Sequence, residues 1–484
     1  MKKNKKIFVS VVLLVALSIL SIGVLSGCSN PKKFFEDVYS QYTSSVKSMT
    51  YYDNDMKKTK SLSLKGSQNE NDFATIDLGE VVEFNTITLV EESKSVTKFS
   101  IYASNEIDKN YKLIYNGDTI ESGRVCYTDT QKYRYLRVFV TSSDKSYNVK
   151  SINVYNNKNE NAKDFRTNTY LVMDSINEES DLTALKTVDE IIAFGTLRFD
   201  KNGDIQFYNS KNEVSEEEEK DKYEKNLNMI KEYLKENNSD AKIYVDVLMP
   251  FGVDGDNNIY AREIMSTHIE KATDNIKNLV ESYGFDGYDI DYEYPNNSKE
   301  WKYYNNFLRK VDEKLGDKIL SVACSAWALK YDKDVIEKID RFELMTYDMF
   351  DKHGYHGAFA SSMLDGLTKA YEKGIDIKKI NLGLPFYSRP TNGHAYWGSY
   401  NQFYDMAGKD NNLVYFEDFD HDGNPMTAPQ YFNSYQMIQD KIAFLIDAKV
   451  GGAMVWHYSC DVNYDKEYSL FKAIYTTKTQ KAIA

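Results

Sequence analysis

Residues 285–295 read FDGYDIDYEYP, and this stretch decides the fold. Side chains alternate between the two faces of an extended strand, so Asp289, Asp291 and Glu293 project to one face and the residues between them to the other. Three acids this close together repel one another and lose hydration inside a folded protein. A structural role does not account for such a pattern. Acids that share protons in this way become strong acids near neutral pH, which points to catalysis.

The chain around this stretch alternates between apolar strand segments and helical segments. From residue 168 to residue 475 the alternation predicts the α/β class, a (β/α)8 TIM barrel with residues 287–294 as its fourth strand. In a barrel the row of acids points inward, and active sites lie at the carboxyl ends of the strands. The eight predicted strands span residues 170–174, 191–196, 242–249, 287–294, 319–326, 342–347, 380–385 and 452–457.

The segments between these strands carry helix and turn signals. Gly284 is expected to end the helix before the fourth strand, Ser298 to cap the helix after it, and the acidic run 216–219 to begin the helix before the third strand. Residues 389–433 are long for a loop and are expected to wall the cleft or to cover the barrel rim. Within them, residues 418–423 copy the start of a calcium loop, but Pro429 stands where the loop needs Glu, so a hairpin is favoured over a calcium site.

Residues 50–156 show short alternating strands and no helical stretch, which predicts an all-β sandwich before the barrel. The segments IDLG, FSIYASN and YRYLRV within it resemble discoidin-type (coagulation factor type C) domains. This resemblance implies a carbohydrate-binding module, although the region holds no Trp and a structural spacer is the alternative. All catalytic candidates follow residue 285, so we expect residues 50–156 to fold alone and to be dispensable for turnover of small soluble substrates.

The N-terminus has the pattern of an export signal. Four lysines precede an apolar run over residues 7–25, and this run ends in Leu25-Ser26-Gly27-Cys28. The pattern resembles a bacterial lipoprotein signal over residues 1–27, which implies cleavage before Cys28 and a lipid anchor on its thiol. The protein is then expected on the extracellular face of the cell membrane, with residues 28–49 as a spacer or short helix. An uncleaved transmembrane helix is the alternative.

Composition narrows the partners and cofactors. Removing residues 1–27, with four lysines and no acid, lowers the formal charge from −13 to −17, which excludes nucleic acid as a natural partner. Cys126, Cys324 and Cys460 are too scattered for a disulfide framework or a cysteine metal site. The six His show no metal-binding spacing, so we expect no metal and no cofactor.

The central stretch resembles the signature of family 18 glycoside hydrolases, the chitinases and endo-β-N-acetylglucosaminidases, which reads D-G-x-D-x-D-x-E on the fourth barrel strand. Asp286, Gly287, Asp289, Asp291 and Glu293 match every fixed position. The resemblance implies that Glu293 donates a proton to the glycosidic oxygen and that Asp291 orients the acetamido group of the substrate. Asp289 corresponds to the inner acid that helps set the charge of Asp291.

Two further segments resemble the same family. Residues 345–348 read MTYD, which implies that Tyr347 hydrogen-bonds the acetamido group and that Asp348 borders the same subsite. Residues 451–456 read GGAMVW, which implies that Trp456 forms the floor under the reacting sugar. Met345 and Tyr294 complete the candidate substrate-binding residues. The third strand departs from the family's S-x-G-G, and the first-strand aromatic is replaced near Asp174, so no hydrogen bond to Asp289 is assigned.

These features predict a retaining hydrolase of β-1,4-linked N-acetylglucosamine, with chitin-type oligomers, the N-glycan core and peptidoglycan all open as substrates. A non-catalytic surface lectin or adhesin on the same barrel is the alternative. Family members that have become lectins commonly lose the terminal Glu or the middle Asp. Both are present here as Glu293 and Asp291, which favours the enzyme.

The export signal yields a first prediction. Metabolic labelling with a fatty-acid analogue is expected to mark the wild-type protein and to leave Cys28→Ser unlabelled, because the thiol of Cys28 is the only atom that the predicted anchor modifies. Cys126→Ser serves as the control and is expected to label like wild type. Equal labelling of wild type and Cys28→Ser would contradict the assignment.

Overall fold

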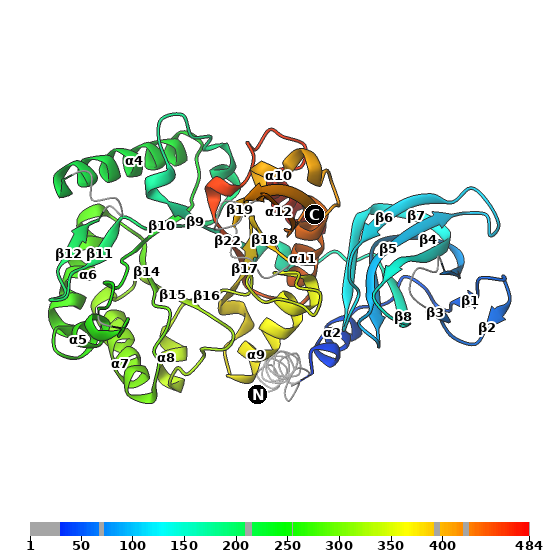
Figure 1. The fold of residues 1–484 in the computed structure, drawn as a ribbon, viewed down its shortest axis with the longest axis horizontal. Coiled ribbons are helices and arrows are strands. Elements are labelled where there is room, and N and C mark those ends of the chain that lie inside the picture. Colours follow the sequence, from blue (N-terminus) through cyan, green and yellow to red (C-terminus); the bar gives the residue numbers. More distant parts are fainter. Residues whose placement is uncertain are drawn as a thin grey trace, which may run out of the picture.

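The computed structural model describes residues 30–66, 72–208, 215–253, 255–391, 397–419 and 425–483. Cys28 and the predicted signal segment lie outside these residues. The chain forms a β-rich region and a barrel that lie side by side (Figure 1). Within the described residues no helix has the length and apolar character needed to cross a membrane.

The β-rich region is one eight-stranded antiparallel sheet folded around its own hydrophobic core. Two 20-residue strands, β4 and β7, pair along most of their length and carry the other strands on either side. Its strands are β1 (Thr50–Tyr52), β2 (Lys58–Thr59), β3 (Leu64–Gly66), β4 (Asp72–Glu91), β5 (Val96–Ser104), β6 (Lys112–Gly117), β7 (Arg124–Ser143) and β8 (Tyr147–Tyr155).

The remainder is a closed barrel of eight parallel strands, which confirms the predicted fold class. Each predicted barrel strand is present. The order around the barrel is β10 (Glu190–Phe194), β13 (Lys242–Asp246), β14 (Gly287–Asp291), β15 (Ile319–Cys324), β16 (Arg341–Leu344), β17 (Ile380–Pro385), β22 (Gly452–Trp456) and β9 (Arg166–Val172).

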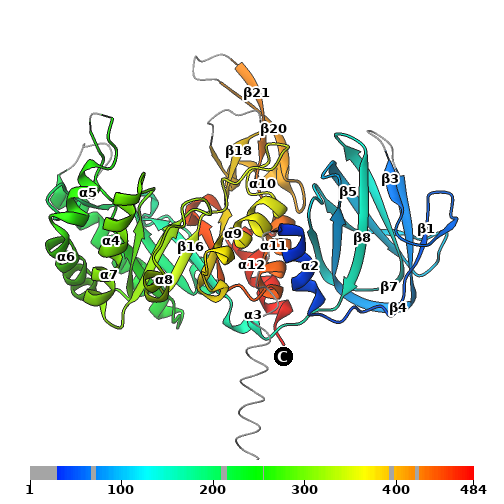
Figure 2. The same cartoon turned by 90° about the horizontal axis from the view of Figure 1, so that it is seen from below.

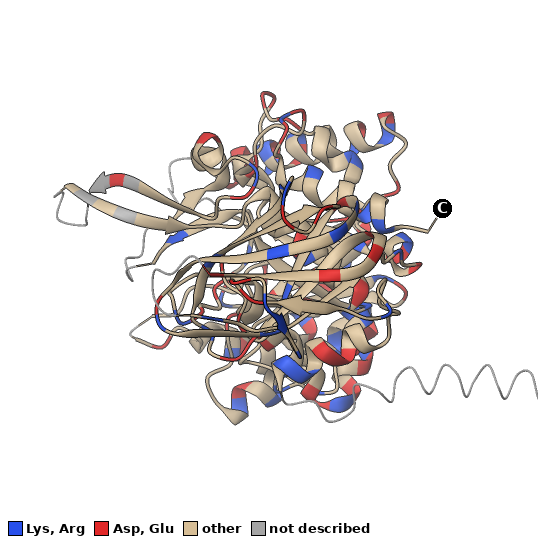
Figure 3. Cartoon of the chain, turned by 90° about the vertical axis from the view of Figure 1, so that its right-hand side faces the viewer, with Lys and Arg blue, Asp and Glu red and all other residues tan. Residues whose placement is uncertain are grey.

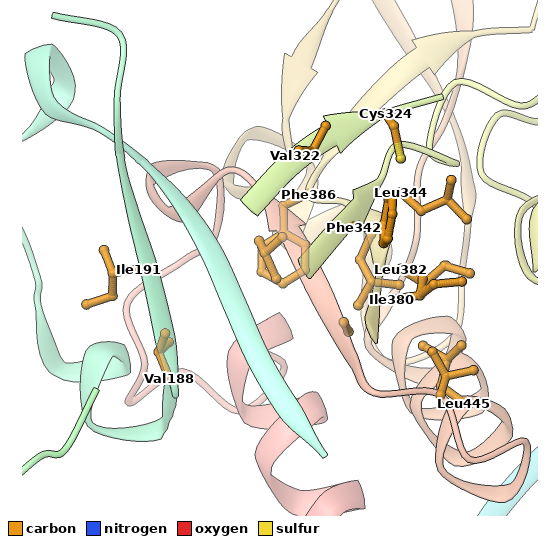
Figure 4. Packing of buried hydrophobic residues seen from close by; sticks show 14 of the residues in the cluster. Val188, Ile191, Val322, Cys324, Phe342, Leu344, Ile380, Leu382, Phe386 and Leu445 are labelled. Carbon is orange, nitrogen blue, oxygen red and sulfur yellow. The ribbon is translucent and has the colours of Figure 1, made fainter. Parts of the chain in front are cut away.

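Helices surround the barrel (Figure 2). They are α4 (Glu216–Glu236), α5 (Ile259–Ser266), α6 (Ile269–Tyr283), α7 (Ser298–Leu315), α8 (Lys333–Lys338), α9 (Gly366–Glu372), α10 (Tyr400–Ala407), α11 (Tyr435–Asp447) and α12 (Leu470–Lys481). Short helical turns are α3 (Asn161–Asp164), η1 (Met173–Ser175), η2 (Thr183–Thr187), η3 (Phe359–Asp365), η4 (Ile377–Lys379) and η5 (Tyr458–Cys460). Apolar side chains of strands and helices fill the layer between them, as with Ile380 and Leu382 of β17 and Leu445 of α11 in Figure 4.

Local signals fix the helix ends. Ser215 and Glu218 form a reciprocal capping box at the start of α4, as the acidic run predicts. Gly284 ends α6 in the left-handed conformation at φ +66°. The cap of α7 is Asn297 rather than Ser298, because the Asn297 side chain accepts the backbone N–H of Lys299 and Glu300.

The segment between the last two barrel strands folds into a small sheet of its own. Its strands, in the order β19-β18-β21-β20, are β18 (Tyr387–Pro390), β19 (Gly398–Ser399), β20 (Leu413–Phe419) and β21 (Pro425–Tyr431). β20 and β21 pair antiparallel, as the hairpin interpretation predicts, and residues 420–424 between them lie outside the described residues. A second small hairpin joins β11 (Leu197–Phe199) and β12 (Ile205–Phe207).

The first described helix, α2 (Pro31–Ser40), belongs to the folded body. Asn30 caps its start, and its buried residues Phe34 and Phe35 pack against Phe444 of α11. Tyr39 stacks near Tyr155 of β8. The helix alternative for residues 28–49 therefore describes this segment, and α2 joins the β-rich region to the barrel.

A buried ion pair links the β-rich region to α11. Arg124 lies 3.0 Å from Asp440, with the two side chains 1% and 0% exposed. Tyr115 donates its hydroxyl to Asp440 at 2.6 Å, and Tyr127 donates its backbone N–H at 2.8 Å. That residues 50–156 fold alone stays a prediction, and their removal would leave Asp440 without these partners.

This interface yields a stability prediction. Arg124→Met is expected to lower the free energy of unfolding by about 3–5 kcal/mol, because it leaves the Asp440 carboxyl buried without its counter-charge. Arg134→Met is the control, since Arg134 pairs with Asp77 at a surface where its side chain is 39% exposed, and a loss of about 1 kcal/mol or less is expected there. Urea unfolding followed by circular dichroism measures both. Equal losses in the two variants would show that the Arg124–Asp440 pair contributes no more to stability than the surface pair of Arg134 and Asp77.

Candidate active site

A cavity of about 400 Å³ opens at the carboxyl ends of the barrel strands. It brings together all of the predicted site residues except Asp289, which lies beneath it, and Cys28, which is outside the described residues. Side chains from after β14, β15, β16 and β22 and from the inserted sheet surround it. The lining residues are Asp291, Glu293, Tyr294, Ser325, Trp327, Met345, Tyr347, Asp348, Tyr387, Arg389, Trp397 and Trp456.

The three acids of the central stretch differ in depth. Asp289 is fully buried, Asp291 is half-buried at the end of β14, and Glu293 is exposed to the cavity. The side chains of Asp291 and Glu293 are hydrogen-bonded to each other. Glu293, the outermost acid, is therefore the one placed to meet a substrate. Asp291 and Asp289 act on Glu293 from behind.

Asp246 extends this row below the cavity and was not predicted as a site residue. It is fully buried on β13, where it pairs in register with Asp289, and its carboxylate accepts the backbone N–H of Asp291 at 3.2 Å. The signal was present in the sequence, because Asp246 is an acid at the end of an otherwise apolar barrel strand.

Tyr170 supplies the support for Asp289 that the sequence did not assign. Tyr170 lies on β9, and its hydroxyl donates a hydrogen bond to the Asp289 carboxylate at 2.8 Å. An aromatic residue of the first strand, four residues before Asp174, thus supports Asp289. Tyr170 also contacts Trp456, with ring centroids 5.3 Å apart.

Burial and mutual repulsion hold protons on this row. Burial raises the pKa of Asp291 well above its ordinary value, and the charges of Glu293 and Asp289 raise it further. Burial and the charges of Asp289 and Asp291 likewise raise the pKa of Asp246. Asp246, Asp289 and Asp291 each keep one buried carboxyl oxygen without a hydrogen-bond partner. The row therefore retains protons at neutral pH and titrates as one coupled group.

Asp348 has the opposite electrostatic character. Arg389 of β18 makes two contacts to its carboxylate, at 2.9 and 3.3 Å, and Tyr387 donates its hydroxyl at 2.8 Å. Burial alone would raise the pKa of Asp348, but the hydrogen bonds and the charge of Arg389 bring this pKa below its usual value. Arg389 and Tyr387 were missed by the sequence prediction, because only the folding of the inserted sheet places them here.

Aromatic side chains wall the cavity. Trp456 is half-buried and packs edge-on against Phe194, and Trp397 stacks on Tyr387 with ring centroids 5.3 Å apart. Trp327 is 56% exposed and borders Tyr294. Flat aromatic faces beside carboxylates and hydroxyls form a surface that suits a sugar ring, whose faces are apolar and whose edge is polar. The inserted segment therefore walls the cleft, as one of its two interpretations predicts.

Fold and site together define a glycoside hydrolase with a TIM barrel. The family model of glycosyl hydrolases family 18 matches residues 143–461, and the chain belongs to this family. Endochitinase 1 of Metarhizium robertsii is 23% identical over 228 residues, which cover 38% of this chain and 54% of that protein. The chain thus matches about half the length of this curated relative.

Solved structures support the fold. A chitinase from Bacteroides thetaiotaomicron superposes with a TM-score of 0.51 at 19% identity, over 65% of this chain and 97% of that one. The Group IV chitinase of Ostrinia furnacalis gives a TM-score of 0.51 at 17% identity, over 65% of this chain and 100% of that one. At these identities the likeness concerns the barrel fold. The discoidin resemblance of residues 50–156 stays a prediction.

The buried acid Asp289 yields a pH prediction. Burial raises the pKa of Asp289 from 3.8 to about 6, although hydrogen bonds from Ser321 and Tyr170 oppose the shift. The folded state therefore binds more protons than the unfolded state between these values, and stability falls as pH rises through this window. Asp289→Asn is expected to gain about 2 kcal/mol relative to wild type between pH 4.5 and pH 7.

Urea unfolding at the two pH values measures this difference. Asp317→Asn on the exposed turn before β15 is the control and is expected to track wild type at both pH values. A pH-independent difference between Asp289→Asn and wild type would mean that Asp289 does not take up the extra proton on folding.

Proposed function

We propose that this enzyme cleaves β-1,4 linkages after N-acetylglucosamine with net retention, using the substrate's own acetamido group as nucleophile. The observation that carries the proposal is the row of acids with graded burial that ends in the exposed Glu293. Glu293 protonates the glycosidic oxygen, and the acids below it set the charge of the site. The family match supports the class of reaction, and the arrangement of acids supports the mechanism.

The positions of the two upper acids argue against a double-displacement mechanism with a carboxylate nucleophile. That mechanism needs two carboxyls about 5–5.5 Å apart on opposite faces of the sugar. Asp291 and Glu293 lie two residues apart on one stretch and are hydrogen-bonded to each other, so they stand on the same side. Asp348, the third acid of the cavity, is held by Arg389 and Tyr387 and is not free to attack.

The substrate's 2-acetamido oxygen is then the remaining nucleophile. Its attack on the anomeric carbon breaks the glycosidic bond and forms an oxazolinium ion, while the Glu293 proton passes to the leaving oxygen. Asp291 and Tyr347 hold the acetamido group, and the Asp291 carboxyl lies beside the positive charge as it develops. Water, activated by Glu293 in its ionised form, opens the oxazolinium from the opposite face and restores the original configuration.

Protons in the row suit this cycle. In the resting state Asp291 and Glu293 share a hydrogen bond, so the proton that Glu293 gives away is held next to a second carboxyl. Asp289 and Asp246 lie behind Asp291. Burial raises the pKa of Asp246, Asp289 and Asp291 alike, so the row holds protons directly behind Glu293.

The proposed substrate is a glycan that carries N-acetylglucosamine at the cleaved position, and chitin-type oligomers, the N-glycan core and peptidoglycan all meet this requirement. We also propose that a lipid on Cys28 holds the enzyme at the extracellular face of the cell membrane, where such glycans are found. Charged residues of both signs are spread over the molecule (Figure 3). Digestion of a glycan panel, read by mass spectrometry, separates these substrates.

The mechanism yields a catalytic prediction. Glu293→Gln is expected to lower kcat by about 10²–10⁴-fold on a chromogenic N-acetylglucosamine oligomer, because the amide cannot donate the proton. Asp291→Asn is expected to lower kcat by about 10²–10³-fold with little change in KM, because its charge acts mainly in the transition state. Glu281→Gln on the outer face of α6 is the control and is expected to match wild type.

The stereochemistry is tested in the same preparations. Proton NMR of the first product is expected to show the β-anomer, a thiazoline mimic of the intermediate is expected to inhibit, and oligomers without the N-acetyl group are expected to resist cleavage. An inverted product, or normal turnover by Glu293→Gln, would overturn the mechanism. Binding of the panel glycans by wild type without turnover would instead favour the lectin.

A further inference from the structure

Three side chains with metal-ligand chemistry meet between the β-rich region and the barrel, away from the cavity described above. Glu121 lies in the turn between β6 and β7, and Asp351 and His353 lie in the loop that follows β16. One potential ligand atom from each lies within 4.8 Å of the other two. Among the described residues this is the one trio of His, Cys, Asp or Glu side chains with such spacing.

His353 presents a free nitrogen to this trio. Its side chain is 9% exposed, and its Nε2 is buried without a hydrogen-bond partner. The ring also hydrogen-bonds the backbone carbonyl of Lys94, and Nδ1 makes this bond because Nε2 has no partner. A proton on Nδ1 fixes the tautomer in which the Nε2 lone pair is available, as in histidines that bind metals.

Asp351 is oriented in a similar way. Its Oδ1 accepts the backbone N–H groups of His353 at 2.8 Å and Tyr355 at 2.9 Å, which closes a tight turn. Its Oδ2 is buried and has no hydrogen-bond partner. Two atoms of different chemistry, one nitrogen and one carboxylate oxygen, are thus both buried and unpaired in the same cluster.

Glu121 adds a second carboxylate from the other region. Glu121 is 5% exposed and has φ +53°, a backbone conformation that residues other than glycine rarely adopt. Glu121 and Asp351 thus bring two carboxylates beside one imidazole, and a bound cation would offset their charge.

We infer that Glu121, Asp351 and His353 bind one divalent cation of the Zn²⁺ type. One imidazole nitrogen with two carboxylates suits this borderline class of metal, and two negative charges balance the ion. A water molecule would complete a four-coordinate site. The absence of a metal motif in the sequence is explained by distance along the chain, since Glu121 comes from the β-rich region and the other two ligands from the barrel.

The position of this site gives it a structural consequence. Asp351 and His353 lie three and five residues beyond Asp348, which lines the catalytic cavity. The same loop is already tied to the β-rich region, because Lys352 lies 3.3 Å from Asp144. A metal at this point would fasten the β6–β7 turn to the loop that carries Asp348. The inference does not depend on the reaction proposed for the cavity.

The test is a titration of the full chain, stripped with EDTA and dialysed, with ZnCl2 in a calorimeter. One Zn²⁺ per chain is expected, together with a rise of the unfolding midpoint when Zn²⁺ is present. Glu121→Gln and His353→Gln are each expected to weaken Zn²⁺ binding at least tenfold and to abolish the rise. His268→Gln, at the start of α6, is the control and is expected to bind like wild type.

A Co²⁺ titration gives a second readout, because ligation by the trio is expected to produce visible absorption bands that both ligand variants lack. Circular dichroism establishes whether the variants are folded. If His353→Gln does not fold, the near-isosteric Glu121→Gln alone serves as the test. No Zn²⁺ binding by wild type would overturn the inference and leave a shared proton in its place. Binding of Zn²⁺ by both ligand variants as tightly as by wild type would also overturn it, as would a preference for Ca²⁺ over Zn²⁺.

Discussion

Four carboxyl groups share one side of the barrel interior, and the architecture of the site follows from the need to keep them there. An ionised carboxylate deep in a protein costs several kcal/mol unless it is paired. Asp289 has the Tyr170 hydroxyl and Asp246 has the Asp291 N–H, but no cation lies in the row. Burial therefore raises the pKa values of Asp246, Asp289 and Asp291, and the row holds protons close to the cavity.

The other elements of the cleft complement this charge pattern. Arg389 from the inserted sheet keeps Asp348 ionised, so a paired carboxylate stands across from the protonated row. Aromatic residues wall the cavity, and Trp456 packs on the same Tyr170 that supports Asp289. The Tyr170 ring in β9 thus connects the acid row to Trp456. A shift of the Trp456 ring would therefore move the hydroxyl that supports Asp289.

The sequence predicted the barrel, its eight strands and the acid row, because alternation and strand-end motifs are local patterns. It missed what depends on contacts between distant segments. Asp246 joins the row only through its register with Asp289, and Arg389 reaches Asp348 only after the insertion folds. The sequence did not assign Tyr170 to the site, because strand alternation alone cannot fix the register of one strand against another.

The joint between the two regions changes how the β-rich region contributes. A module on a flexible linker raises the local concentration of substrate but samples many orientations. Here Arg124 forms an ion pair with Asp440, and Tyr115 donates a hydrogen bond to the same carboxylate. Helix α2 also packs its aromatic residues against α11. Such a joint removes that orientational freedom. Any glycan held by the β-rich region would then meet the cleft at one fixed angle and distance, so the joint acts as a constraint on which substrates the two regions are able to engage together.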